Sequence, residues 1–144
     1  MKRQVFSLIS LLSLLLIAGS AIAQTVHVRA DIPFNFAVGN KTLPAGMYII
    51  KTISDRDTTT LVVQAQDGQS STMTNSNAAE NLKPANKSKL VFNRYRDHYI
   101  LSEIWVAGAN RGRRLPKTSR EKEWARDLAQ DLTQRKVEIV ASLY

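Results

Sequence analysis

The chain of 144 residues carries 20 lysine or arginine residues against 12 acidic residues, for a formal net charge of +8, and it contains no cysteine. The lack of cysteine excludes disulfide bridges, thiol nucleophiles, thiolate metal sites and iron–sulfur clusters. The two histidines have no metal-ligand spacing, so the sequence implies neither a zinc site nor any cofactor.

The first 23 residues have the pattern of a secretory signal peptide. Basic residues precede an apolar stretch over 8–18, and Ala21-Ile22-Ala23 has the small residues after which signal peptidase cuts. An uncleaved anchor fits less well, because the apolar stretch is short of the ~20 residues that span a bilayer. We therefore expect cleavage after Ala23 and export to the periplasm or beyond. The mature chain 24–144 is expected to be a single domain without a membrane span.

Positive charge is concentrated in one part of the mature chain. Residues 83–120 hold ten basic residues against two acidic ones, Asp97 and Glu103, whereas the rest of the mature chain is slightly negative. Such asymmetry indicates an acidic partner better than overall charge does. The partner would be an anionic glycan, a lipid head group or another acidic surface, and not a specific nucleic acid.

Short alternating segments predict strands through the first half of the mature chain. The segments 25–30, 34–38 and 47–53 have strand composition and are separated by turn residues. Two further segments flank Asp67-Gly68 and predict a hairpin, because both residues tolerate positive φ. The polar, asparagine-rich stretch 75–88 is expected to form the longest loop.

A second hairpin is predicted for the segments 89–95 and 99–106. Asp97 fits a turn between them better than a catalytic triad, because no serine lies in a nucleophile motif. Strict alternation places large apolar side chains on both faces of the later strand: Tyr99, Leu101 and Trp105 on one, and Ile100, Ile104 and Val106 on the other. A strand that is apolar on both faces is covered on both, so we expect it to be central.

The hydrophobic period changes after the second hairpin. Thr118 and Glu121 have the spacing of a capping box, and apolar residues recur every four positions from Trp124, which predicts a helix over about 119–134. The final segment, 136–144, is β-branched and alternating, so a last strand is favoured over a longer helix. The predicted fold is mainly β: a small antiparallel sandwich or barrel of about eight strands, with the helix on one face or at one end.

Two stretches, DIPFNFAVGNKTLPAGMYII and KLVFNRYRDHYILSEIWVAGANRGRRLPKTSREKEWA, resemble a family of small secreted bacterial proteins with no assigned activity. The opening PFNFAVGNKTLPAGMY and the close EIWVAGANRGRRLP carry the resemblance, which covers most of residues 31–125. It implies a secreted β-rich domain. It brings no catalytic residues to this chain.

The segment 108–120 is the densest basic stretch and contains no acidic residue. Its candidate anion-binding residues are Arg111, Arg113, Arg114, Lys117 and Arg120. In a loop, such a guanidinium group would bind a phosphate or carboxylate bidentately, through two hydrogen bonds. The free N–H groups at the start of the helix would lie next to the same anion. The alternative is a solvated connection whose arginines pair with nearby glutamates, Glu121 and Glu123 among them.

Glu103 is a second candidate, because it lies between apolar residues on a central strand and should be partly buried. A buried carboxylate either shifts its pKa upward, as general acid–base catalysis requires, or pairs with a cation. We favour a buried ion pair with Arg94, Arg111 or Arg113, since no second carboxylate completes a glycosidase pair.

The aromatic residues near the second hairpin, Tyr95, Tyr99 and Trp105, are either a stacking platform for sugars or bases or part of the core, and the core is favoured. Together the sequence favours a secreted, non-enzymatic β-domain that binds an anionic partner through 108–120. The alternatives are a structural protein that assembles through an uncovered sheet edge and, with less support, an enzyme built on Glu103.

Overall fold

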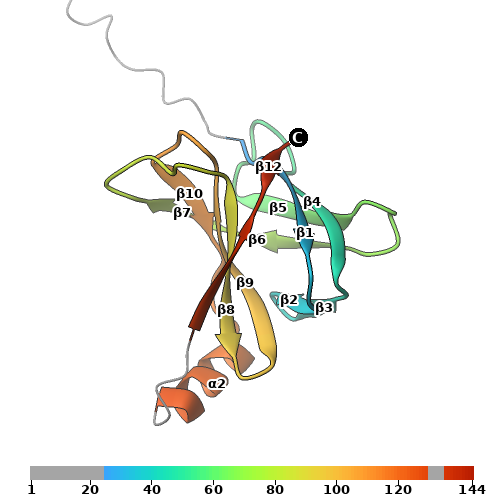
Figure 1. The fold of residues 1–144 in the computed structure, drawn as a ribbon, viewed down its shortest axis with the longest axis vertical. Coiled ribbons are helices and arrows are strands. Elements are labelled where there is room, and N and C mark those ends of the chain that lie inside the picture. The colour runs from blue at the N-terminus through green and yellow to red at the C-terminus, as the bar shows by residue number, and fades with distance from the viewer. Residues whose placement is uncertain (1–24, 130–134) are drawn as a thin grey trace, which may run out of the picture.

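A computed structural model describes residues 25–129 and 135–144, and the expected signal peptide lies outside this range. In the described chain two sheets face each other as a sandwich, with one helix beside them (Figure 1). Strands account for 54% of the chain and helix for 8%, so the prediction of a mainly β fold is confirmed. The sandwich is the correct alternative, because the described strands form no closed barrel.

The two sheets share the strands as follows. The first sheet has the order β12 (Ser142–Leu143), β1 (His27–Ile32), β4 (Gly46–Thr52), β5 (Thr60–Ala65) and β6 (Ser71–Asn75). The second sheet has the order β11 (Arg135–Val140), β8 (Lys89–Tyr95), β9 (His98–Trp105), β10 (Arg111–Arg114) and β7 (Asn77–Glu80). The hairpin of β2 (Phe36–Val38) and β3 (Lys41–Leu43) joins the second sheet through a parallel pairing of β2 with β9.

The core lies between the sheets, and period-2 alternation explains why these segments form strands. In β1, buried Val28, Ala30 and Ile32 alternate with side chains that face away from the core. The strands β4 and β5 follow the same pattern, with Ile50 and Leu61 fully buried. The Asp67-Gly68 hairpin is present, and its glycine has a φ of 74°.

The chain crosses from one sheet to the other inside two long extended segments. Strand β6 runs through Ser76 into β7, and β11 runs through Ala141 into β12. At each crossing the backbone N–H donates to a neighbouring segment, from Ser76 to the Thr59 carbonyl (2.8 Å) and from Ala141 to the Ser88 carbonyl (2.9 Å). The crossings split single segments into two strands each, which is one reason why the fold has more strands than expected.

The two crossing segments agree with the sequence-based expectation to different degrees. The final segment is extended, as favoured, and pairs with both sheets. The prediction of a loop over 75–88 is wrong in part, because Asn77–Glu80 forms the edge strand β7 against β10. The segment contains little apolar surface, and its pairing with a distant strand leaves no local signal.

A bulge in the central hairpin changes which side chains face the core. Val91 pairs with Glu103 while its neighbour Phe92 pairs with Leu101, so Ser102 has no partner on β8. An extra residue of this kind reverses the alternation beyond it. Leu101 and Ile104 therefore share the main core, whereas Ile100 and Trp105 pack in two separate clusters. The expected pairing of Leu101 with Trp105 on one face is wrong for this reason, although β9 is central and buried as predicted.

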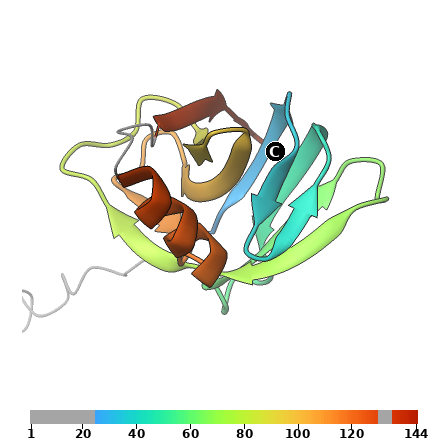
Figure 2. The ribbon, with the colours of Figure 1, turned by 90° about the horizontal axis from the view of Figure 1, so that it is seen from below.

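The helix α2 (Ser119–Ala129) lies at the end of the second sheet where β8 turns into β9 (Figures 1 and 2). Thr118 caps it, because its Oγ1 accepts the Glu121 N–H at 3.1 Å. The last part of the expected helix, 130–134, lies outside the described residues. No helix in the described chain has the length and apolar character that a membrane crossing needs.

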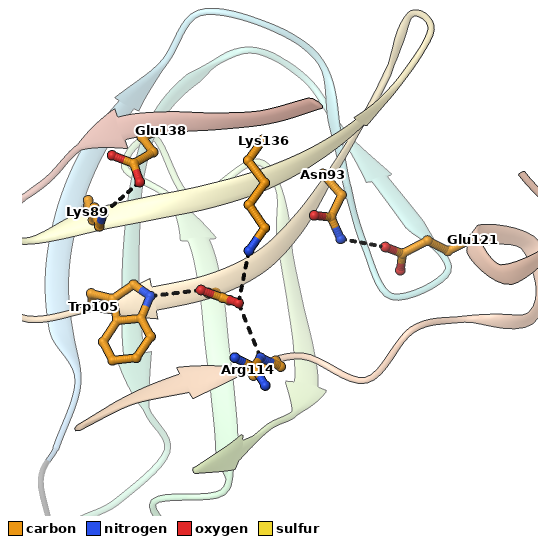
Figure 3. A network of polar contacts seen from close by, with 8 residues as sticks. Lys89, Asn93, Trp105, Arg114, Glu121, Lys136 and Glu138 are labelled. Carbon is orange, nitrogen blue, oxygen red and sulfur yellow. Dashed lines mark hydrogen bonds and ion pairs between the residues drawn. The ribbon is translucent and has the colours of Figure 1, made fainter. Parts of the chain in front are cut away.

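The Glu121 side chain fixes the helix to the sheet. Its carboxylate accepts from Asn93 Nδ2 at 2.9 Å and from the Tyr95 hydroxyl at 3.1 Å, and the Glu121 residue is only 3% exposed. Burial, reinforced by the Glu121 charge, raises the pKa of Tyr95, so its hydroxyl stays protonated and donates. The buried carboxylate therefore orients the helix relative to β8 (Figure 3).

Candidate functional site

The basic segment 108–120 does not form the expected loop. Residues Arg111–Arg114 are the strand β10, and only the residues that follow lead irregularly into α2. The sequence missed this strand because four consecutive polar or glycine residues have low strand propensity. Pairing with β9 and β7 on its two sides overrides that propensity.

The three arginines of β10 are held by three different partners. Arg111 Nε lies 3.0 Å from Glu80 Oε1 in an exposed ion pair. Arg114 Nε lies 3.2 Å from Glu103 Oε1. Because each guanidinium group has its own partner on the protein, the structure does not bring these side chains together into one anion site.

Arg113 is a structural cation. It is 9% exposed, and it donates from Nε to the Ser76 hydroxyl at 3.0 Å and from Nη2 to the Ser76 carbonyl at 2.9 Å. Burial lowers its pKa, and the charge of Asp57 partly offsets this. Arg113 thus satisfies the backbone at the point where the chain crosses between the sheets, which a solvated loop residue would not do.

Glu103 is buried and ion-paired, but its cationic partners differ from those the sequence suggested. Its carboxylate accepts from Trp105 Nε1 at 3.0 Å and lies near Arg114 and Lys136, at 3.2 and 3.6 Å (Figure 3). Burial by itself raises the pKa of Glu103, but the Trp105 hydrogen bond and the two cations outweigh it, so the pKa is lowered. Arg94 instead donates to the Arg96 carbonyl at 2.8 Å.

Two candidates of the basic segment remain available, Lys117 and Arg120. Both are exposed, and in the described part of the chain neither has an ion pair. The Arg120 guanidinium lies 6.0 Å from the ring centre of Trp124, within cation–π range. Arg120 also lines a cleft to which none of the β10 arginines contributes.

This helix-side cleft has a volume of about 380 Å³ and lies between the β2–β3 hairpin, the β8–β9 turn and the start of α2. Its polar lining residues are Asn35, Asn40, Thr42, Asp97, His98, Thr118 and Arg120, and its aromatic lining residues are Phe36, Tyr99 and Trp124. A pocket with an aromatic wall and a few converging polar groups is the usual form of a small-molecule site.

The aromatic wall centres on His98 and Trp124. Their rings are parallel within 8°, with centroids 4.3 Å apart. Of the residues that the sequence offered as a stacking platform, Tyr95 and Trp105 are buried, as the favoured core reading expects. Tyr99 lines the cleft but stacks on Phe34, with ring centroids 3.9 Å apart. The pairing of His98 with Trp124 was missed because it joins a strand to a helix 26 positions later, and no local pattern indicates that contact.

The described residues contain no cluster of three or more histidine, aspartate or glutamate side chains that could hold a metal ion. Comparisons with known proteins found no matching family model, no similar curated protein and no similar solved structure. The resemblance to a family of small secreted proteins therefore stays a prediction, and the function has to be argued from the site.

Proposed function

We propose that the protein is an exported, non-enzymatic module that binds an anionic partner of the cell envelope, and that its ligand site is the helix-side cleft. The observation that carries the proposal is the difference within the basic segment. The arginines of β10 are used by the fold, whereas Arg120 lines a cleft and has no carboxylate partner among the described residues. The net positive charge of the chain would attract an anion from a distance, and Arg120 would then bind it.

An enzyme built on Glu103 has less support. General acid–base catalysis by a carboxyl at neutral pH needs a raised pKa, and the pKa of Glu103 is lowered. Glu103 also lines none of the clefts described for this chain. Its contacts to Arg114, Lys136 and Trp105 fit an ion-pair network that joins β9 to its neighbours.

The test compares two charge-equivalent variants on a heparin column. Arg120→Gln and Arg111→Gln each remove one positive charge from an exposed side chain, but only Arg120 lines the cleft. We expect Arg120→Gln to elute at clearly lower salt than the wild type, and Arg111→Gln to elute close to it. Equal shifts for both variants would mean that retention follows net charge alone, and the cleft would not be the site.

A second candidate function is self-assembly, and one observation favours it. Strand β6 pairs with β5 on one side only, and the run 69–79 around it contains no charged residue. Charges at sheet edges normally prevent edge-to-edge pairing. Lys41 covers one point of this edge, where its Nζ donates to the Ser71 carbonyl at 2.7 Å.

Sedimentation at several concentrations tests this second candidate. If β6 pairs with a second copy, Met73→Lys on β6 should abolish a dimer that the wild type forms. Met47→Lys, which puts the same charge on the inner strand β4 of the same sheet, is the matched control and should leave the dimer intact. A wild type that stays monomeric at high concentration would contradict self-assembly.

A further inference from the structure

We propose that the helix-side cleft binds a sugar ring that carries a carboxylate, such as one uronic acid unit of an acidic glycan. This inference rests on the proposed function and names the ligand class for the same site. The parallel rings of His98 and Trp124, the amide and hydroxyl groups around them and the single arginine carry it together.

The size of the cleft suits one small ligand or one unit of a longer chain. Its volume of about 380 Å³ lies near the lower end of the range of about 300–1,000 Å³ for small-molecule pockets. A smaller hollow of about 130 Å³ adjoins it and shares His98 and Trp124, with Arg96 and Asp127 on its other side.

The polar lining matches hydroxyl groups better than it matches phosphate. The amides of Asn35 and Asn40 and the hydroxyl of Thr42 both donate and accept, as sugar hydroxyls do. The Asn35 amide oxygen already accepts the Ala45 N–H at 3.0 Å, which leaves its NH₂ group to donate. Asp97 only accepts, so it would repel a phosphate but would receive a bond from a hydroxyl.

The two formal charges of the lining set the orientation of such a ring. Arg120 is the group that binds a carboxylate, because a guanidinium and a carboxylate form charge-assisted hydrogen bonds. Asp97 excludes negative charge from its own side. A sugar with one carboxylate and several hydroxyls satisfies both groups, whereas a chain of phosphates, which has no hydroxyl groups along its length to donate to Asp97, does not.

The rings of His98 and Trp124 cover each other's inner faces, so it is an outer face of this stacked pair that takes the apolar face of the sugar ring. A pyranose presents C–H groups on its faces and hydroxyls at its rim, so an aromatic ring beside polar groups complements it. Trp124 is held in place before any ligand arrives, because Glu121 fixes its helix to Asn93 and Tyr95. A preformed wall lowers the entropic cost of binding.

The experiment follows the two indole N–H signals of the protein by ¹⁵N–¹H NMR during titration with three probes. The probes are an oligosaccharide of galacturonic acid, the neutral galactose oligosaccharide of the same length, and inorganic polyphosphate. We expect the acidic oligosaccharide to shift the Trp124 signal saturably and to leave the buried Trp105 signal, which is bonded to Glu103, in place. The neutral oligosaccharide should bind the same place about tenfold more weakly.

Three variants assign the contacts. His98→Ala should raise the Kd of the acidic oligosaccharide about tenfold, through the loss of one aromatic contact. Arg120→Gln should raise the Kd of the acidic oligosaccharide about tenfold and leave that of the neutral one unchanged. Arg111→Gln is the control and should change neither. All three residues are exposed, so the variants should fold.

The outcomes separate the two proposals. Binding of polyphosphate that depends on Arg120, without binding of either oligosaccharide, would overturn the sugar and leave the anionic partner standing. Equal binding of both oligosaccharides, with no effect of Arg120→Gln, would overturn the carboxylate contact. If none of the three probes moves the Trp124 signal, both the sugar and the cleft as ligand site are wrong.

Discussion

The two halves of the basic segment differ in how the fold uses their charge. In the first half, the β10 arginines contact Glu80, Ser76 and Glu103, and Arg113 is buried. In the second half, Lys117 and Arg120 stay exposed where the chain enters α2. The difference shows that a dense run of cations predicts a charged segment, but it does not predict which of its side chains are available to bind a ligand. Availability depends on the segments that lie next to each cation in space.

The largest expected effect comes from Gly112, between the arginines of β10. A Cβ there would lie 2.6 Å from the Ile104 carbonyl oxygen and 2.6 Å from the Trp105 ring. Gly112→Ala should therefore lower the free energy of unfolding by about 3 kcal/mol, measured by urea denaturation. Gly108→Ala is the control: it meets open space and should cost only about 1–2 kcal/mol through its φ of 79°. Equal losses would show that Trp105 does not pack against β10.

Arg113 and Arg111 lie on the same strand but should differ in how much each stabilises the fold. Arg113→Ala leaves the carbonyl and hydroxyl of Ser76 without their buried donor, and should cost about 2–3 kcal/mol of unfolding free energy. Arg111→Ala removes an exposed ion pair and should cost less than about 1 kcal/mol. Thermal denaturation of both variants measures the difference. Similar melting temperatures would contradict a structural role for Arg113.

The stabilisation that the Glu103 ion pairs with β10 and β11 provide should depend on pH. The pKa of Glu103 is lowered in the folded protein from the ordinary value of 4.5, so its ionised form stabilises the fold above that pH. This contribution is lost as pH falls through the lowered pKa. Glu103→Gln should cost about 1–2 kcal/mol at neutral pH, and the difference from wild type should shrink below about pH 4. A difference that is independent of pH would argue against the ion pairs with Arg114 and Lys136.

The smallest effect concerns the turn that borders the cleft. Arg96 has a φ of 54°, a left-handed conformation that glycine adopts without steric cost. Arg96→Gly should raise the free energy of unfolding by about 1 kcal/mol, measured by chemical denaturation. A loss of stability would mean that contacts of the arginine outweigh the strain.

The fold class was predictable because its main signals are local. The alternation of Val28, Ala30 and Ile32 and the cap at Thr118 each depend on a few neighbouring residues. The bulge at Ser102 was not predictable, since an inserted residue looks the same as regular alternation until the partner strand is known. Glu103 was correctly expected to be buried, but its partner Lys136 comes from a strand 33 positions later.

The candidate site was harder to predict than the fold. The cleft is built from 35–42, 97–100 and 118–124, three segments that only the folded chain brings together. From its sequence neighbours, His98 is predicted to be a turn residue and Trp124 an apolar helix residue. Neither local pattern predicts that the two rings are in contact. Of the proposed anion-binding residues, Arg120 alone lines that cleft. Counting charges along the sequence indicates a basic segment. A binding site depends in addition on which distant segments the fold places next to it.

The crossings at Ser76 and Ala141 have a mechanical consequence. A sandwich of two sheets can fail by separation of its layers, and many small domains resist this with covalent bridges between cysteines. This chain has no cysteine. Its own backbone passes from one sheet to the other at both crossings, so continuous polypeptide joins the two layers. The layers therefore cannot separate until the strands at the crossings lose their hydrogen bonds to the sheets.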